Sequence, residues 1–415
     1  MKWIALQPLI GGMAIAAENA FGTPPSAVIS YKGIGNCDYY VSYLNDVKKY
    51  NINHYRLNDG AYSLTEEFEN DENGVPVTTW DNELFKDLDC VIAVPICAGL
   101  SGANCASNDS EYCKGSDAIQ NNNMLGCLNI VMNHLKPKVY MFENAYALAT
   151  NLGEGIREKI IKIANDAGYG VNIVKVNTLN HGIPQHRKRT FVICCKDSNA
   201  IKLNYDGPKQ VKTLKELFKD LPETIDKGNC PEIDKAWIQY MKDKYGENYR
   251  ESWENNNKRS IDEIAFENGD LEECKKYFKD NPRGIEIIEH ILNKTKNGKG
   301  WMSGAPSYSG ESLSPAIYTR TITKLWHPIE ERHLCVREIM RLMCLPDDFP
   351  EVPRSKAPII GQNVVVTTAQ YYCEQVKNWL DGKSPTHNEK NIIQDFSKRE
   401  KNKNKNKIKA FWKKT

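Results

Sequence analysis

Short apolar runs alternate with amphipathic stretches throughout the first 200 residues of the chain. The runs have the length and β-branched content of buried strands, and the stretches between them carry apolar residues at helical spacing. We predict strands at 3–6, 28–31, 55–58, 89–94, 138–142, 171–176 and 189–195, and helices at 13–20, 39–50, 124–135 and 155–167. Strands that alternate with helices in this way indicate an α/β fold with a doubly wound, Rossmann-like sheet.

The pattern changes after Tyr205, where the chain becomes rich in Lys, Glu, Asp and Asn until about Lys299. Amphipathic pieces in this region indicate a separate, helix-rich insert that forms a second, smaller domain. Nine Lys and Arg residues against one Glu at 398–415 are typical of a basic tail. We therefore expect four parts: an α/β domain at 1–200, the insert at 201–315, a return to the first domain at 316–382, and a basic, disordered tail at 383–415.

Composition and charge narrow the class of protein. A formal net charge of +2 means that any surface for nucleic acid must be local. The 13 cysteines are odd in number and form no C-x-x-C pair, which favours neither a zinc site nor a redox pair, so we expect no metal and a reducing compartment. No stretch is apolar enough to span a membrane.

The N-terminus allows two interpretations. Lys2, the apolar run that follows it and Ala14-Ile15-Ala16 are similar to a secretory signal. Gln7, Pro8 and Gly11-Gly12 interrupt that run, so we favour a strand, a turn and a helix.

Cys97 is the first candidate for chemistry, in the segment Val94-Pro95-Ile96-Cys97-Ala98-Gly99-Leu100-Ser101. A residue just after a buried strand lies at the carboxyl edge of the sheet, where open α/β folds place their active sites. A lone cysteine is more often structural, and a nucleophile needs neighbours that stabilise its thiolate.

Glu143 follows another predicted strand and should face the same edge, although a helix N-cap or a loop residue is the simpler interpretation. In Gln185-His186-Arg187-Lys188-Arg189, alternation places Gln185, Arg187 and Arg189 on one face of an extended segment. Two guanidinium groups on one face suit a phosphate or a base carbonyl, and a solvated charge run is the alternative.

Two glycine-containing turns are weaker signals. Leu9-Ile10-Gly11-Gly12 lies between a strand and a helix and can offer backbone N–H groups to a cofactor. Ile360-Gly361-Gln362-Asn363-Val364 precedes the last predicted helix. The first turn lacks the full Gly-x-Gly-x-x-Gly spacing, which argues against a dinucleotide-binding dehydrogenase.

In this order, the motifs resemble the cytosine-5 DNA methyltransferase family, of bacterial and phage type, over about residues 3–200 and 313–380. Connecting pieces match as well: Lys136–Lys138, Asn177–Pro184, Thr213–Pro222, His327-Pro328, Arg332–Glu338 and Leu345–Phe349. The resemblance implies a methyltransferase sheet with a target-recognition domain. It also implies that S-adenosylmethionine methylates C5 of a cytosine flipped out of duplex DNA.

The resemblance assigns roles to single residues. Cys97 would attack C6 of the base, Glu143 would bind N3 and the exocyclic amine, and Arg187 and Arg189 would orient the base and the adjoining phosphate. For S-adenosylmethionine it implies contacts from Gln7, Leu9, Ile10, Gly11 and Gly12 to the amino-acid end, from Asp59 near the adenine, and from Pro95, Gln362 and Asn363 around the pocket.

The chain departs from the family pattern at several positions. Gln7 and Leu9 stand where an aromatic residue and a glycine are usual, and Ser30-Tyr31 supplies no acid for the ribose. Ile96 and Ala98 flank the cysteine in place of Pro and Gln, and Gln362 replaces Asn. The Asn121–Asn123 run replaces an Arg that usually precedes the next helix.

The resemblance also implies partners. Sequence readout would come from the insert through the major groove, with Tyr308, Arg320 and Trp301–Gly304 as candidates. We expect duplex DNA as substrate, a cognate restriction endonuclease in a restriction-modification system, a monomer, no membrane, and the cytoplasm of a bacterial or phage-infected cell. Two alternatives stay open: a tRNA cytosine-5 methylase built on the same motifs, and a DNA-binding relative that has lost catalysis.

Overall fold

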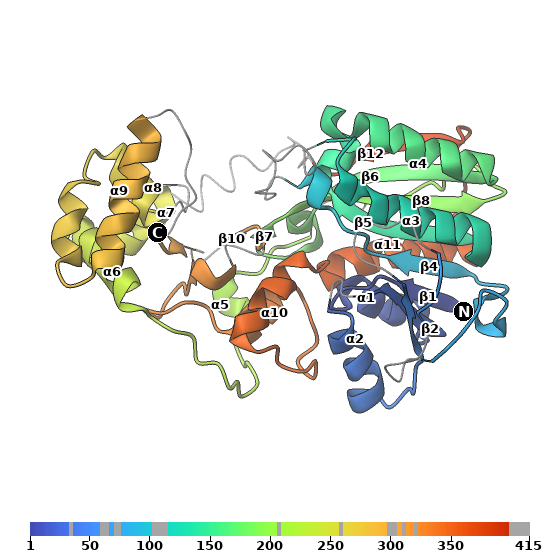
Figure 1. Ribbon diagram of the computed structural model, residues 1–415, viewed down its shortest axis with the longest axis horizontal. Helices are drawn as coiled ribbons and strands as arrows, with labels where there is room; N and C mark the ends of the chain where they lie inside the picture. The colour runs from blue at the N-terminus through green and yellow to red at the C-terminus, as the bar shows by residue number, and fades with distance from the viewer. Residues whose placement is uncertain are drawn as a thin grey trace. The chain divides into compact units, whose positions relative to one another are not determined.

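The computed structural model describes residues 1–32, 36–58, 66–69, 76–101, 115–205, 209–256, 260–296, 305–308, 313–318 and 322–397. The chain forms two compact units (Figure 1): unit 1 comprises Met1–Ile183, Arg187–Val211 and Asn363–Thr415, and unit 2 comprises Pro184–His186 and Lys212–Gln362. Asp59, Trp301–Gly304, Arg320 and the side chain of Tyr308 lie outside what the structure describes.

Unit 1 is built on one large, mostly parallel sheet. Its described strands are β1 (Trp3–Leu6), β2 (Ala27–Tyr31), β3 (His54–Leu57), β4 (Cys90–Ala93), β5 (Val139–Ala145), β6 (Tyr169–Asn177), β8 (Lys188–Lys196) and β12 (Asn391–Asp395). Their order is β12-β6-β8-β5-β4-β1-β2-β3, and β8 runs antiparallel to both of its neighbours. This arrangement confirms the predicted doubly wound α/β class.

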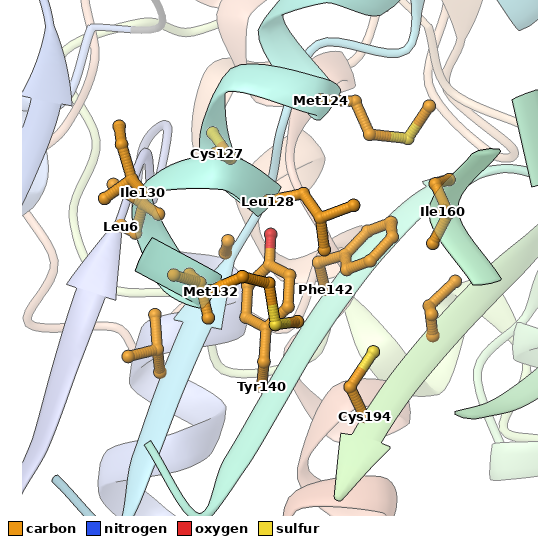
Figure 2. Close-up of a cluster of buried hydrophobic side chains, with 14 of the residues drawn as sticks. Leu6, Met124, Cys127, Leu128, Ile130, Met132, Tyr140, Phe142, Ile160 and Cys194 are labelled. Atoms are coloured by element: carbon orange, nitrogen blue, oxygen red, sulfur yellow. The ribbon is translucent and has the colours of Figure 1, made fainter. Parts of the chain in front are cut away.

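Helices cover both faces of this sheet. On one face lie α3 (Asn122–Ile130), the π-helical turn η5 (Val131–Leu135) and α4 (Glu154–Asp166). Leu128 and Met132 from α3 and η5 lie next to Phe142 and Tyr140 of β5 (Figure 2), and Met124 belongs to the same apolar cluster.

On the other face, α1 (Gly12–Phe21) packs along α11 (Val366–Leu380). The ring of Tyr372 in α11 stacks on Phe191 in β8. Because both faces are covered, β1, β2 and β4 are buried at every residue, which explains their unbroken apolar runs.

Unit 2 has a helical core of its own. It contains α5 (Leu214–Leu217), α6 (Glu232–Tyr245), α7 (Tyr249–Asn255), α8 (Ile261–Glu267), α9 (Pro282–Lys296) and α10 (Val336–Leu342). Trp237, Trp253 and Phe278 are fully buried in its apolar cluster. The described part also contains two short parallel strand pairs: β7 (Gln185–His186) with β10 (Ser314–Pro315), and β9 (Ser307–Tyr308) with β11 (Leu325–Trp326).

Two of the expected boundaries need correction. Unit 2 continues to Gln362, so the chain re-enters unit 1 at Asn363 and not at residue 316. The tail expected from residue 383 contains β12, which pairs with β6 in the main sheet. The remaining tail, 398–415, is outside the described residues. No helix in the described ranges is long and apolar enough to cross a membrane.

Candidate active site

The strand order of the sheet reverses between β1 and β4. From β1 the chain continues through β2 to β3 on one side, and from β4 to β5 on the other. In open α/β sheets the crevice outside the carboxyl ends of two such strands is where ligands bind. The turn Gln7–Gly12 leaves β1 at this edge, and the segment that carries Cys97 leaves β4 beside it.

The loop that carries Cys97 is held by backbone and asparagine contacts. Cys97 is partly buried, and its carbonyl accepts a hydrogen bond from Leu100 N at 3.0 Å, which closes a 3-10 turn. Asn144 Nδ2 donates to the carbonyl of Pro95 at 3.4 Å. The backbone N–H of Ile96 donates to Asn123 Oδ1 at 2.8 Å.

Glu143 and Arg189 form an ion pair next to this loop. The antiparallel register of β5 and β8 places Ala145 opposite Arg189, and Arg189 Nε lies 2.9 Å from Glu143 Oε1. Glu143 was expected to follow its strand, but β5 continues through it to Ala145. Cys97 and Arg189 both line a pocket of about 370 Å³, together with Leu100, Ser101, Ala145, Tyr146, Ala147, Thr150 and Lys188.

Burial governs the ionisation of these groups. It raises the pKa of the Glu143 carboxyl to about 7, although the guanidinium groups of Arg189 and Arg187 act in the opposite direction. Burial also raises the pKa of the Cys97 thiol, and Arg189 opposes that shift. Near pH 7 the thiol is therefore neutral and the Glu143 carboxyl is partly protonated.

Arg187 is not part of an exposed charge run, because its side chain is buried. Its Nη2 donates to the carbonyl of Asn363 at 2.7 Å, and burial together with Arg189 lowers its pKa to about 9. Gln185 is buried as well, and its amide donates to the carbonyl of Leu342 at 3.0 Å. Lys188, between the two arginines, is exposed.

The turn after β1 offers donors to a cofactor. Gln7 and Asn363 are buried, and each uses its side-chain oxygen for a backbone N–H, that of Tyr31 at 3.0 Å and that of Gly12 at 2.8 Å. Gln7 Nε2 and Asn363 Nδ2 have no hydrogen-bond partner among the described residues. Two buried amide donors fit a ligand with a carboxylate and ring acceptors, as S-adenosylmethionine has.

Other residues of the expected cofactor set differ in their surroundings. Leu9 has φ 56°, the left-handed conformation that explains why glycine is usual there. A side chain at Gly11 would collide with the ring of Tyr40, so this glycine is also required by packing. Ile10 and Pro95 are buried, and Gln362 is exposed.

The end of β2, where the family's ribose acid is missing, is followed by Lys32. Its ammonium group forms an ion pair with Glu69, a mostly buried carboxylate from a separate segment. Sequence reasoning did not find this pair, because nothing in the spacing of residues 32 and 69 links them. It also did not assign Tyr146 or Asn123 to the Cys97 loop and pocket.

Together these features define a class of enzyme. A doubly wound sheet carries a thiol after β4, a buried carboxylate at the end of β5 and a guanidinium at the start of β8, beside the Gln7–Gly12 turn after β1. A thiol next to charged groups in a pocket is typical of enzymes that act through a covalent intermediate.

Residues 1–378 match the family described as C-5 cytosine-specific DNA methylase, and the chain belongs to this family. It is similar to the Type II methyltransferase M.MthTI of Methanothermobacter thermautotrophicus, with 23% identity over 59% of this chain and 68% of that protein. It is 28% identical to M.PspPI of Psychrobacter sp. (strain TA137) over 52% of this chain and 48% of that protein. The chain thus spans about two thirds of one of these relatives and about half of the other.

A solved structure shows the same fold. It is a DNA modification methyltransferase encoded within a prophage, from E. coli, with a TM-score of 0.53 and 18% identity. The similarity covers 92% of this chain and 99% of that one. The resemblance inferred from the motifs is therefore confirmed at the level of family and fold.

Proposed function

We propose that this chain methylates C5 of a cytosine in duplex DNA through a covalent adduct between Cys97 and C6 of the base. The observation that carries the proposal is the pocket in which Cys97 and Arg189 lie together, with Glu143 paired to Arg189, in a chain of the C-5 cytosine-specific family. A base in a stacked duplex cannot enter such a pocket, so the cytosine is flipped out.

The chemistry begins at Cys97, whose thiol first loses its proton to solvent and becomes the attacking thiolate. Its sulfur pair forms the S–C6 bond, and the π pair of the C5–C6 bond moves toward C5, which becomes nucleophilic. Glu143 in its neutral form donates a hydrogen bond to N3 and stabilises this charge, while Arg189 holds Glu143 and the O2 side of the ring. After C5 has been methylated, a base removes its proton, the double bond re-forms and the Cys97 sulfur leaves.

S-adenosylmethionine supplies the methyl group when it is bound. The residues proposed to hold it are the Gln7–Gly12 turn (Gln7, Leu9, Ile10, Gly11 and Gly12), Pro95 and the Gln362-Asn363 segment, with Asp59 near the adenine. The unpartnered amides of Gln7 and Asn363 support this assignment.

Arg187 is proposed to act from its buried position. Its guanidinium donates to the carbonyl of Asn363, and the side chain of Asn363 accepts the backbone N–H of Gly12. Arg187 therefore links the start of β8 to the turn after β1. The contact with a phosphate that the resemblance implies is better suited to the exposed Lys188 and to Arg189.

We assign target recognition to the helix-rich insert within residues 201–315, with Tyr308, Arg320 and Trp301–Gly304 as readout candidates. A restriction-modification role, a cognate endonuclease, a monomeric state and a cytoplasmic location belong to the same proposal. The Type II methyltransferase names of the relatives support the first of these.

The proposal is tested by incubating the protein with labelled S-adenosylmethionine and either duplex DNA or tRNA. We expect label in DNA, no incorporation by Cys97→Ser, and covalent trapping of the parent protein alone on duplex DNA that contains 5-fluorocytosine. Label in tRNA only would favour the RNA alternative. DNA binding without transfer or trapping would favour a relative that has lost catalysis, and equal labelling by Cys97→Ser would overturn the role of Cys97.

A further inference from the structure

Ile96, the residue before Cys97, needs a hydrogen-bond acceptor for its backbone N–H, which a proline at this position would not need. Proline has no backbone N–H, whereas Ile96 brings one into a partly buried loop. A buried N–H without an acceptor costs about 1–3 kcal/mol. In this chain the acceptor is Asn123 Oδ1, 2.8 Å away, from the first turn of α3.

Asn123 satisfies the Ile96 N–H but, among the described residues, has an unsatisfied donor of its own. Its side chain is fully buried, and its Nδ2 has no hydrogen-bond partner in the described parts of the chain. An apolar residue of similar size would avoid that unsatisfied donor. The contact that the asparagine does make is with the residue adjacent to Cys97.

The rest of the loop is fixed from the same side. Gly115 N donates to the Gly99 carbonyl at 2.9 Å, and Asn121 Nδ2 donates to the Gly115 carbonyl at 2.9 Å. A side chain at Gly99 would collide with Asn121. The start of α3 and the turn before it therefore hold the loop on both sides of Cys97.

We propose that Asn123 is a positioning residue for the Cys97 nucleophile. Its side-chain oxygen accepts the hydrogen bond from the Ile96 N–H and so fixes the loop that carries the sulfur. This inference rests on the proposed role of Cys97. It predicts that Asn123 and Ile96 act as a pair: the asparagine is needed when isoleucine precedes the cysteine and becomes dispensable when proline does.

The test measures the rate of covalent trapping on duplex DNA containing 5-fluorocytosine, with saturating S-adenosylmethionine, and separately the Kd for the same duplex. Asn123→Leu should slow trapping about 10- to 100-fold, because displacement of the attacking atom by about 1 Å has effects of this size. The Kd should change less than about threefold, since the DNA contacts remain. Asn122→Leu, at the neighbouring position of the same helix, is the matched control and should trap at the parent rate.

Rescue by proline is the decisive comparison. In Ile96→Pro the rate should stay near that of the parent, and adding Asn123→Leu to it should lower the rate by less than about threefold, because no N–H is left to satisfy. Asn123→Asp keeps the acceptor but adds a negative charge near the thiol. Compared with the parent at the same pH, its rate should be lowest at low pH and approach the parent rate as the pH rises, whereas the Asn123→Leu rate stays well below the parent rate throughout.

An unchanged rate in Asn123→Leu would overturn the inference. So would a double variant as slow as Asn123→Leu, or an Asn123→Asp rate that stays equally far below the parent rate at every pH. Cys97→Ser separates failure of the proposed function from failure of the positioning role. If Cys97→Ser is still trapped on the DNA, the proposed function fails. If it is not trapped while Asn123→Leu is trapped at the parent rate, only the positioning role fails.

Discussion

The carboxyl group of Glu143 lies at the end of β5 with Arg189 Nε 2.9 Å away, and burial still raises its pKa to about 7. A neutral carboxyl can donate a hydrogen bond to a ring nitrogen, which a carboxylate cannot do. The pKa of the Cys97 thiol is raised as well. Adduct formation therefore needs one group protonated and the other deprotonated.

These two requirements predict a bell-shaped pH dependence. The neutral Glu143 is present below about pH 7 and is lost as the pH rises through that value, whereas the thiolate grows with pH. We expect kcat/KM for DNA, which reports the free enzyme, to show both limbs. In Glu143→Gln the descending limb should disappear, and kcat/KM at the optimum pH should be about 10²- to 10⁴-fold lower. An identical descending limb in this variant would show that another group is responsible.

Sequence reasoning at the residue scale found those residues whose chemistry is visible in their type and order. Cys97, Glu143 and Arg189 were singled out and are close together in the structure. Asn123 was noted only as part of a run that replaces an arginine. Its contact with Ile96 spans 27 positions, and only the packing of α3 on the sheet creates it.

At the scale of elements, β12 shows how a strand can be hidden in sequence. Its residues, Asn-Ile-Ile-Gln-Asp, form only a short apolar run next to a basic segment. The strand exists because β6 has an open edge that it can pair with. Asn180 Nδ2 donates to the Phe396 carbonyl at 2.6 Å, and Lys175 pairs with Asp395 at 3.2 Å, which fixes the register.

Removing β12 should therefore destabilise unit 1. A chain that ends at Glu389 lacks the ladder with β6, and we expect its Tm to fall by about 5–10 °C, from several hydrogen bonds of about 1 kcal/mol each. A chain that ends at Ser397 retains β12 and should melt within about 1 °C of the full-length protein. Thermal melts of the three proteins check this, and equal Tm values would show that β12 adds no stability.

At the scale of the whole molecule, charge is distributed unevenly. The formal net charge is only +2, yet residues 398–415 carry nine Lys and Arg and one Glu. Such a segment binds phosphates without regard to base sequence. This segment begins directly after Ser397. The hydroxyl of Ser397 lies 3.4 Å from the hydroxyl of Tyr146, which lines the Cys97 pocket.

The tail should add a salt-sensitive part to DNA binding. In the chain that ends at Ser397, the slope of log K against log salt concentration should become shallower by about 0.9 for each phosphate that the tail would have neutralised. A full-length variant with the tail Lys and Arg changed to Gln should behave in the same way, which separates charge from length. An unchanged slope in both proteins would exclude the tail from DNA binding.

The sequence by itself determined the strand–helix alternation, the doubly wound class and the order of the family motifs, because these depend on local periodicity and on residue type. Only the tertiary structure decided where the second unit ends, that β12 joins the sheet, that Arg187 is buried against Asn363, and that Asn123 holds the loop of Cys97. Those features are contacts between distant segments, and the free energy that selects them comes from burial and hydrogen-bond satisfaction in the assembled core.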